Sequence, residues 1–257
     1  MKLVALGSSS AGNCFVMQFD LGDGQKPFSL MVECGFPYQT IIKKATPYGI
    51  KLGELDACLI THCHKDHSAA AGDLAKRGIQ IYATNGTIQA LNLKGIARTM
   101  TYGEPISLSP SVKAMAFQVS HDAPEPAGFI IKTKKETVIF AIDSNKWLAD
   151  LSEIAADYLF IEANYDQNLM AQEQFSLRRR AGLKDMQRFK VNERIKTSHM
   201  SIDETLATIS KINKTKLKTI FLTHLSDRMS SPSLWKVKVS ALSGVPCWVA
   251  RKDCGME

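Results

Sequence analysis

Three of the six histidines of this 257-residue chain lie in one short segment, HCHKDH, which covers residues 62–67. It directly follows ACLIT (57–61), a short apolar run typical of a buried strand. The residues after it favour a helix over 67–77. The segment therefore predicts a strand-to-helix loop, the place where α/β proteins often carry their chemistry. Any fold adopted by this chain has to present a cluster of imidazoles at a strand end.

The spacing within the segment predicts two sets of metal ligands. On an extended loop, His62 and His64 project to one side, and Cys63 projects to the other as a small filler. Asp66 and His67 lie at the beginning of the helix and face a neighbouring point. Imidazole and carboxylate together suit Zn²⁺, Mn²⁺ or Fe²⁺. The alternative is a solvated polar loop, but four potential ligands at HxHxDH spacing argue against it.

Three further potential ligands stand at the ends of strand-like runs. His121 ends VKAMAFQVSH, Asp143 ends TVIFAID, and His224 ends TIFLTH. A lone histidine at a strand end is more often structural than functional. Three such residues beside the HxHxDH segment indicate instead that the strand ends complete a metal site.

The remaining pattern favours an α/β (α+β) fold in which two sheets are covered by outer helices. Strands are expected over KLVAL, CFVMQFD, SLMVEC, QIYAT, VKAMAFQVS, AGFIIKT and ETVIFAID, with turns at LGDGQKP and NGT. The last two runs, joined by KTKKET, predict an antiparallel hairpin. Helices are expected over residues 38–47, 67–77, 146–156, 166–190, 202–213 and 232–243.

Two helix beginnings carry capping signals. Ser201 with Glu204 matches a capping box, and Ser231 before Pro232 matches an N-cap followed by proline. No linker rich in proline or glycine divides the chain. We therefore expect one domain over residues 1–257, with a basic arm at about 166–198.

Composition limits the class of protein. Apolar residues make up 45% of the chain, but their runs are strand-sized, and a membrane span needs about 20. MKLVALGSSSAGNC has an apolar run too short for a signal, which needs about 7–15 residues. We read it as a strand and expect a cytoplasmic protein without a membrane partner. No CxxC spacing occurs, so we expect reduced thiols at Cys14, Cys34, Cys58, Cys63, Cys247 and Cys254.

The charge pattern favours a polyanionic partner. The net charge is +7, although many enzymes without a nucleic-acid role are as basic. Residues 178–196 hold eight Lys or Arg against two acidic residues. They can neutralise phosphates or simply form a solvated helix face. Arg178, Arg179 and Arg180 are our first candidates for substrate contacts.

The GSSSAGN loop is a second candidate for phosphate contact. Ser8, Ser9 and Ser10 offer hydroxyls and backbone amides, and the alternative is a tight turn stabilised by its own serines. Asn13 is the more structural member. No GxxxxGK[ST] motif is present, so ATP-driven chemistry is not indicated.

HCHKDH, VSHDAPEPAGFII, FAIDSN and IFLTHLSDR together resemble the metal motifs of the metallo-β-lactamase superfamily. The resemblance implies an αββα sandwich that holds two divalent ions, Zn²⁺ or Mn²⁺. It places His62, His64 and His121 on one ion and Asp66, His67 and His224 on the other. It makes Asp143 the bridge and gives Glu33, in MVECG, the task of orienting a ligand histidine.

Other stretches narrow the resemblance. GSSSAGNC and VSHDAPEPAGF are similar to motifs of the YycJ/WalJ group of exonucleases, and IEANYD, SHMS and THLS also resemble tRNase Z. The resemblance implies that Glu162 and His199 act together at the scissile phosphate. It also implies that a hydroxide held between the two ions attacks, with Asp66 orienting it.

We therefore expect a metal-dependent phosphodiesterase or nuclease, foremost a 5′-to-3′ DNA exonuclease. An RNA-end or cyclic-nucleotide phosphodiesterase is the first alternative. A lactone or thioester hydrolase and a non-catalytic nucleic-acid binder are the others. The expected partner is nucleic acid, DNA first. The oligomeric state stays open, with a homodimer as one option.

Overall fold

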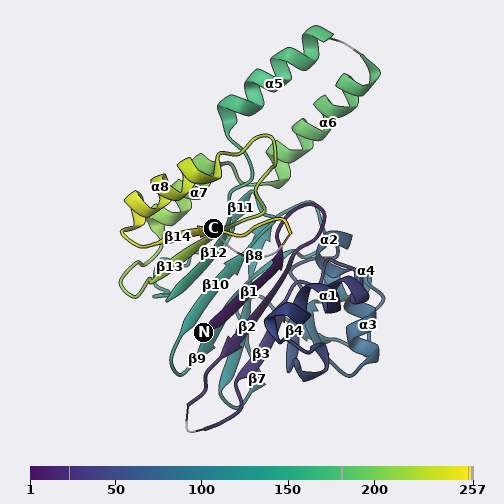
Figure 1. The fold of residues 1–257 in the computed structure, drawn as a ribbon, viewed down its shortest axis with the longest axis vertical. Coiled ribbons are helices and arrows are strands. Elements are labelled where there is room, and N and C mark those ends of the chain that lie inside the picture. Colours follow the sequence, from purple (N-terminus) through teal and green to yellow (C-terminus); the bar gives the residue numbers. More distant parts are fainter. Residues whose placement is uncertain (23, 181, 254, 256–257) are drawn as a thin grey trace.

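The centre of the molecule is a pair of β-sheets that face each other, with helices on both outer sides (Figure 1). The computed structural model describes residues 1–22, 24–180, 182–253 and 255. The first sheet has the order β1-β2-β3-β4-β5-β6, formed by Lys2–Gly7, Cys14–Phe19, Phe28–Val32, Ala57–Leu59, Gln80–Thr84 and Arg98–Met100.

The second sheet has the order β11-β8-β9-β10-β12-β13-β14, and β7 pairs with β8 at its side. Its strands β7 to β14 are Pro105–Ser109, Val112–Ser120, Ala127–Thr133, Thr137–Ala141, Lys146–Trp147, Tyr158–Glu162, Thr219–Thr223 and Cys247–Val249. β9 and β10 form the expected antiparallel hairpin, which pairs Phe129 with Phe140. β10, β12, β13 and β14 run parallel to one another.

Aromatic side chains fill the space between the sheets. Along β2, alternate residues point to opposite faces, so Phe15 enters the core between the sheets while Val16 packs on the outer side. The Phe15 ring lies edge-on to the rings of Phe140 and Phe160 in the second sheet, at 5.3 and 5.9 Å between centroids. Both faces of each sheet are therefore buried.

Helices cover the outer face of each sheet. The first sheet carries α1 (Tyr38–Ala45), α3 (Ala71–Lys76) and α4 (Asn85–Ala90), whose buried residues join its outer cluster. The second carries α7 (Ile202–Lys211) and α8 (Pro232–Ser243), which bury Ile209 and Trp235. Short turns of helix lie at α2 (Lys65–Ser68), η1 (Thr46–Tyr48) and η2 (Leu52–Glu54). This order of layers, helices–sheet–sheet–helices, confirms the αββα prediction.

A helical hairpin projects from the sandwich (Figure 1). It consists of α5 (Gln167–Arg180) and α6 (Leu183–Ser198), which pack side by side. The sequence had favoured one helix over 166–190, but α6 begins afresh after Gly182, whose backbone is extended. Glycine has a weak preference for helix interiors and so favours a break there. The hairpin base is anchored by Tyr165, Met170 and Met229.

The expected helix over 146–156 is wrong. Lys146 and Trp147 form β11, which pairs antiparallel with Ser120 and Val119 of β8. Downstream, the side chain of Asp150 accepts a hydrogen bond from the backbone amide of Ser152 at 2.9 Å, a local turn that competes with a helix.

Two other local predictions also needed correction. NGT (85–87) begins α4 instead of forming a turn, and the carboxylate of Glu125 accepts a hydrogen bond from the Gly86 amide in its first turn. The helix over 67–77 is split into α2 and α3, because the amide of Ala70 donates to the carbonyl of Cys34. A tertiary hydrogen bond thus interrupts the helix.

The capping box is present: the Ser201 hydroxyl accepts a hydrogen bond from the Glu204 amide, and the Glu204 carboxylate accepts one from the Ser201 amide. Ser231 occupies the N-cap of α8, but its side chain makes no capping hydrogen bond. Among the described residues, no helix is both long and apolar enough to cross a membrane. The described cysteines are free thiols, and Cys254 lies outside the described residues.

Candidate metal centre

Side chains from both sheets meet at one edge of the sandwich, where several strands end. Residues 62–67 follow β4, while His121 directly follows β8 and His224 directly follows β13. Asp143 comes two residues after β10. Because β10 and β13 belong to the parallel part of the second sheet, their carboxyl ends lie at the same edge.

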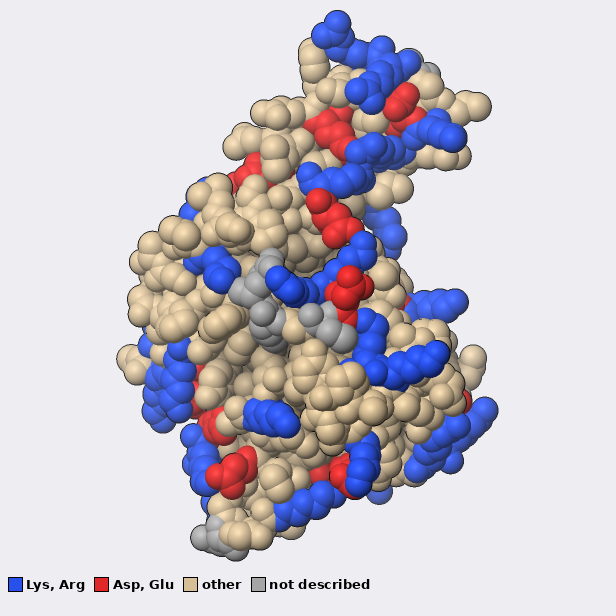
Figure 2. Space-filling model, viewed as in Figure 1, with Lys and Arg blue, Asp and Glu red and all other residues tan. Residues whose placement is uncertain are grey.

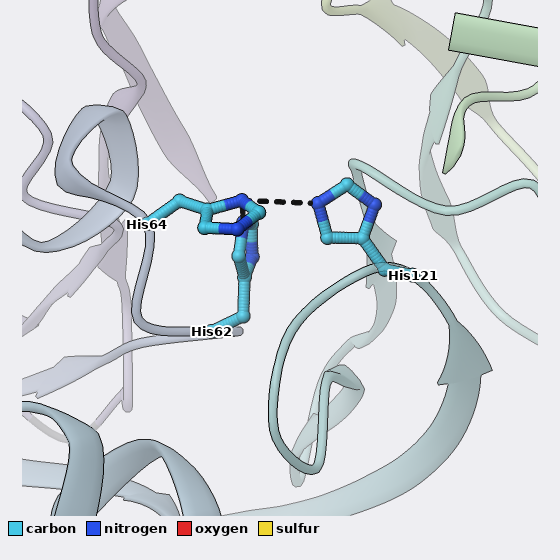
Figure 3. A group of neighbouring side chains, drawn as sticks. All are labelled: His62, His64 and His121. Carbon is cyan, nitrogen blue, oxygen red and sulfur yellow. Dashed lines mark hydrogen bonds between the residues drawn. The ribbon is translucent and has the colours of Figure 1, made fainter. Parts of the chain in front are cut away.

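His62, His64 and His121 form the first group of potential ligands (Figure 3). Nδ1 of His64 lies 3.0 Å from Nε2 of His62 and 3.2 Å from Nε2 of His121. On the far side of its ring, Nδ1 of His121 donates to the carbonyl of Ser198 at 2.9 Å. A carbonyl only accepts, so neutral His121 turns its Nε2 lone pair toward the group.

Asp66, His67, Asp143 and His224 form the second group, with ligand atoms within 4.8 Å of one another. Nε2 of His67 lies 3.1 Å from Oδ2 of Asp143 and 3.5 Å from Oδ2 of Asp66. Its other ring nitrogen, Nδ1, faces Oε2 of Glu33 at 3.4 Å. A carboxylate in that place orients an imidazole for metal binding.

Asp143 lies between the two groups. Its Oδ2 is 3.1 Å from Nε2 of His67 and 3.9 Å from Nε2 of His121, and its Oδ1 is 3.1 Å from Nδ1 of His224. The side chain is only 3% exposed. From this position one carboxylate can reach ions held by either group.

Backbone strain gathers at this edge. Glu33, Asp143 and His224 all have positive φ, at 65°, 50° and 54°, which is uncommon for residues other than glycine. Such conformations persist where the surrounding structure fixes them. The amide of His224, for example, donates to the hydroxyl of Ser8 at 2.9 Å. The strain indicates that the fold holds these side chains in place.

Glu162 and His199 form a third, overlapping group with Asp143 and His224. Oε1 of the fully buried Glu162 lies 2.6 Å from Nδ1 of His199 and 3.2 Å from Nδ1 of His224. Its Oε2 accepts a hydrogen bond from the amide of Ser144 at 2.7 Å. His199 keeps 12% of its side chain exposed, so it stands between the buried ligands and solvent.

The histidines of the site differ in the direction in which their pKa is shifted. Burial lowers the pKa of His62 well below its usual range and also lowers the pKa of His121. Burial acts the same way on His199, but the charge of Glu162 and its hydrogen bond outweigh it and raise the pKa of His199 to about 9. His62 and His121 therefore favour the neutral form that binds metal, while His199 favours the protonated form at neutral pH.

The donor set fits divalent cations. In the first group, ring nitrogens face one another at 3.0 to 3.2 Å, and a cation among them would satisfy their lone pairs together. In the second, Nε2 of His224 is buried without a hydrogen-bond partner. The combination of imidazole and carboxylate suits Zn²⁺ or Mn²⁺. Cys63 belongs to none of the ligand groups found among the described residues.

The residues of the GSSSAGN loop have two different positions at this site. Ser8 and Ser9 are buried, and Asn13 is fully so. The Asn13 amide group lies 3.1 Å from Nε2 of His67, and the backbone amide of Asn13 donates to the carbonyl of Asp66. Asn13 thus stabilises the histidine turn. Ser9 and the exposed Ser10 instead line a cavity of about 310 Å³ that also contains His199 and His224.

Arg178, Arg179 and Arg180 do not lie beside the potential metal ligands. They are the last three residues of α5, at the end of the hairpin that points away from the sandwich (Figure 1). Arg178 stacks over the Phe189 ring at 5.0 Å, and Arg179 lies over the Phe175 ring at 5.8 Å. The structure therefore does not bring these arginines to the metal ligands.

Different residues provide the charge beside the site. Arg194 and Arg228 line the cavity that holds His199. The side chain of Arg194 donates to Oδ2 of Asp122 at 2.6 Å, and Oδ1 of Asp122 lies 3.3 Å from Nε2 of His121. Asn164 donates to the carbonyl of His224 at 2.8 Å.

Sequence reasoning missed these four residues. Asp122 and Asn164 were accessible to it, since one follows His121 directly and the other comes two residues after the end of β12. Arg194 lies in the basic segment 178–196 and Arg228 ends the motif IFLTHLSDR, but neither stretch indicated that these two side chains line the site.

Comparison with known proteins identifies the family of this chain. A model described as a beta-lactamase superfamily domain matches residues 32–225. Over 245 residues the chain is 26% identical to exodeoxyribonuclease WalJ of Streptococcus pneumoniae, covering 88% of this chain and 81% of the relative.

Solved structures agree on the fold. The metallo-beta-lactamase fold protein YhfI of Bacillus subtilis matches with a TM-score of 0.69 at 16% identity, over 99% of this chain and 98% of that one. The short form of human tRNase Z matches with a TM-score of 0.60 at 19% identity, over 88% and 94%. The chain therefore belongs to the metallo-β-lactamase superfamily and is a hydrolase of that family.

Proposed function

We propose that this protein is a metal-dependent nuclease that hydrolyses phosphodiester bonds, foremost a 5′-to-3′ DNA exonuclease. The observation that carries the proposal is the Glu162–His199 pair at the rim of the ligand groups, with Nδ1 and Oε1 2.6 Å apart. A protonated imidazole held there suits a leaving alkoxide of a phosphate ester. The similarity to an exodeoxyribonuclease over most of the chain supports DNA as the substrate.

The ligand residues would hold two divalent cations, Zn²⁺ or Mn²⁺: His62, His64 and His121 hold one, and Asp66, His67 and His224 hold the other, with Asp143 between them. When bound, such cations lower the pKa of water and withdraw charge from a phosphate. Glu33 orients the His67 ring.

Asp66 has a task beyond ligation. It is 26% exposed on its side chain, more than Glu33, Asp143 or Glu162. It can therefore accept a hydrogen bond from the attacking water and set the direction of attack.

His199 is the proton donor to the leaving group. Glu162 accepts a hydrogen bond from Nδ1 of His199, so Nε2 is the atom that donates to the leaving oxygen. Because the pKa of His199 is raised to about 9, the ring carries this proton at neutral pH. General acid assistance of this kind is typically worth about 10²–10⁴-fold.

The charge distribution supports a polyanionic substrate. Residues 167–198 contain eight basic and three acidic residues, so the hairpin supplies five of the net seven positive charges. Figure 2 shows Lys and Arg side chains gathered over the outer end of the hairpin, at the top of the view. Such charges neutralise backbone phosphates without reading sequence.

The test is hydrolysis by purified protein supplied with Mn²⁺ or Zn²⁺. Substrates are 5′- and 3′-end-labelled double- and single-stranded DNA, RNA, cyclic nucleotides and a thioester. We expect release of mononucleotides from 5′ ends of DNA. The matched control is Asp143→Asn under the same conditions, which excludes a contaminating nuclease.

Other outcomes would redirect the assignment. Cleavage of RNA ends or cyclic nucleotides alone would leave the phosphodiesterase chemistry and replace the substrate. Turnover of the thioester alone would overturn the proposal, because such a reaction needs neither a basic hairpin nor the Glu162–His199 pair.

A further inference from the structure

A second cavity, of about 530 Å³, extends along the hairpin from the loop after β13 to Arg180, the last residue of α5. The α5 residues that line it include Gln172, Glu173, Ser176 and Arg180, which are spaced along one face of the helix. Arg188 of α6 and Arg228 of the loop are the other charged residues of the lining.

Positive charge dominates this cavity. Oε1 of Glu173 accepts hydrogen bonds from Arg228 at 2.6 Å and is ion-paired with Arg188. Oε2 of the same carboxylate accepts a hydrogen bond from Asn192 at 2.7 Å. Within the described residues, Arg180 makes no ion pair. Three arginines and one carboxylate therefore line the space, which leaves an excess of positive charge around it.

One residue, Arg228, lies between the cavity and the candidate active site. Arg228 lines this cavity and also the cavity that contains His199 and His224. A polyanionic strand seated at the ligands can leave along the hairpin and pass Arg228 without leaving the basic surface. The hydroxyl of Ser176 and the amide of Gln172 add hydrogen-bond donors to the lining of the cavity.

We propose that this cavity is a phosphate subsite, which binds a backbone phosphate of the substrate strand away from the bond that is cleaved. Arg180, Arg188 and Arg228 supply the charge, and a guanidinium can bind two phosphate oxygens at once. The subsite rests on the proposed nuclease function and adds to it the path of the strand. Glu173 holds two of the arginines in place and competes with the phosphate.

The first test compares Arg188→Gln with wild type on single-stranded DNA, from dinucleotides to about 20 nucleotides. The variant is expected to raise KM for the long strands about tenfold and to leave kcat unchanged. Dinucleotides, too short to reach the subsite, should be cleaved with unchanged kcat/KM. The slope of log KM against log salt should become less steep by about 0.7, the value for one lost contact to a single strand.

Lys190→Gln is the matched control. It removes one positive charge from the same helix two residues away, which places it on the opposite face, and it does not line the cavity. It should change KM much less than Arg188→Gln. Equal effects of the two variants on long strands would mean that the hairpin acts only through its total charge, and the subsite would be rejected.

Glu173→Gln separates binding from folding. It breaks the same ion pairs as Arg188→Gln but removes the competing negative charge, so KM for long strands should fall. If both variants raise KM, the cluster only holds the hairpin in place and the subsite is wrong. If inorganic phosphate binds in the cavity while the variants leave KM for long strands unchanged, the cavity binds free anions and the proposed subsite for the substrate strand is wrong.

Failure of the nuclease proposal can be distinguished from failure of the subsite. If the protein is not a nuclease, the wild type cleaves DNA of no length.

Discussion

The edge of the sandwich that carries the potential metal ligands differs from the α5–α6 hairpin in burial and in the exposure of its charges. At the edge, His62, His67 and Glu162 are completely buried. Several of its polar atoms face one another at short distances, as do Nδ1 of His199 and Oε1 of Glu162 at 2.6 Å. On the hairpin, large apolar side chains such as Phe175 (64% exposed) and Leu183 (85%) stand in solvent beside many charges. The edge is built to hold a few atoms in fixed positions, whereas the hairpin carries many exposed charges.

This contrast suggests a division of labour. A buried, low-dielectric edge strengthens each electrostatic interaction and suits chemistry. An exposed basic hairpin gives attraction that salt can screen and suits retention of a long substrate. The predictions below either break this division or sharpen it.

The largest effect is expected for Asp143→Asn. This carboxylate lies between both ligand groups, so its loss should lower bound metal and reduce turnover by more than about 10⁴-fold. Elemental analysis and steady-state kinetics on the same preparation measure both quantities. Full metal content with normal turnover would show that Asp143 is not a shared ligand.

His199→Gln should leave bound metal intact and lower kcat by about 10²–10⁴-fold, because it removes the proposed proton donor. The loss should shrink for a substrate whose leaving group needs no protonation, such as a nitrophenyl phosphodiester. If the variant instead loses metal, His199 is a ligand within the third group, with Asp143, Glu162 and His224.

The pH dependence of stability should reveal the Glu162–His199 pair in metal-free protein. The pKa of His199 is raised in the folded state to about 9, so its contribution is complete below the unfolded value of about 6.5 and is lost as pH rises through about 9. The free energy of unfolding should fall by about 3 kcal/mol across that window. Denaturant titrations of wild type and His199→Gln measure it, and parallel curves for the two would contradict the shift.

The smallest effect concerns salt. Raising salt from about 50 to 200 mM should increase KM for long DNA by about tenfold, because the proposed contacts between the hairpin and phosphates would be screened. Hydrolysis of a small phosphodiester and the metal content should stay nearly constant, since the edge is buried. Equal salt sensitivity of long DNA and the small diester would remove the assigned role of the hairpin.

Local sequence patterns determined much of this protein. Strand alternation and the strand-end positions of HCHKDH, His121, Asp143 and His224 depend only on residues near one another in the chain. The same holds for the capping box at Ser201. These features appear in the structure where the patterns place them, because backbone geometry fixes which side chains stand at a strand end.

Tertiary contacts decided the rest. Pairing with β8 turned residues 146–147 into a strand, and the carbonyl of Cys34 split the helix after His67. A break at Gly182 carried Arg178–Arg180 to the outer end of the hairpin, while Arg194 and Arg228 came to the site from segments far apart in sequence. No local pattern encodes such meetings, because they depend on how whole elements pack, and a short-range signal yields to a long-range hydrogen bond or strand pair.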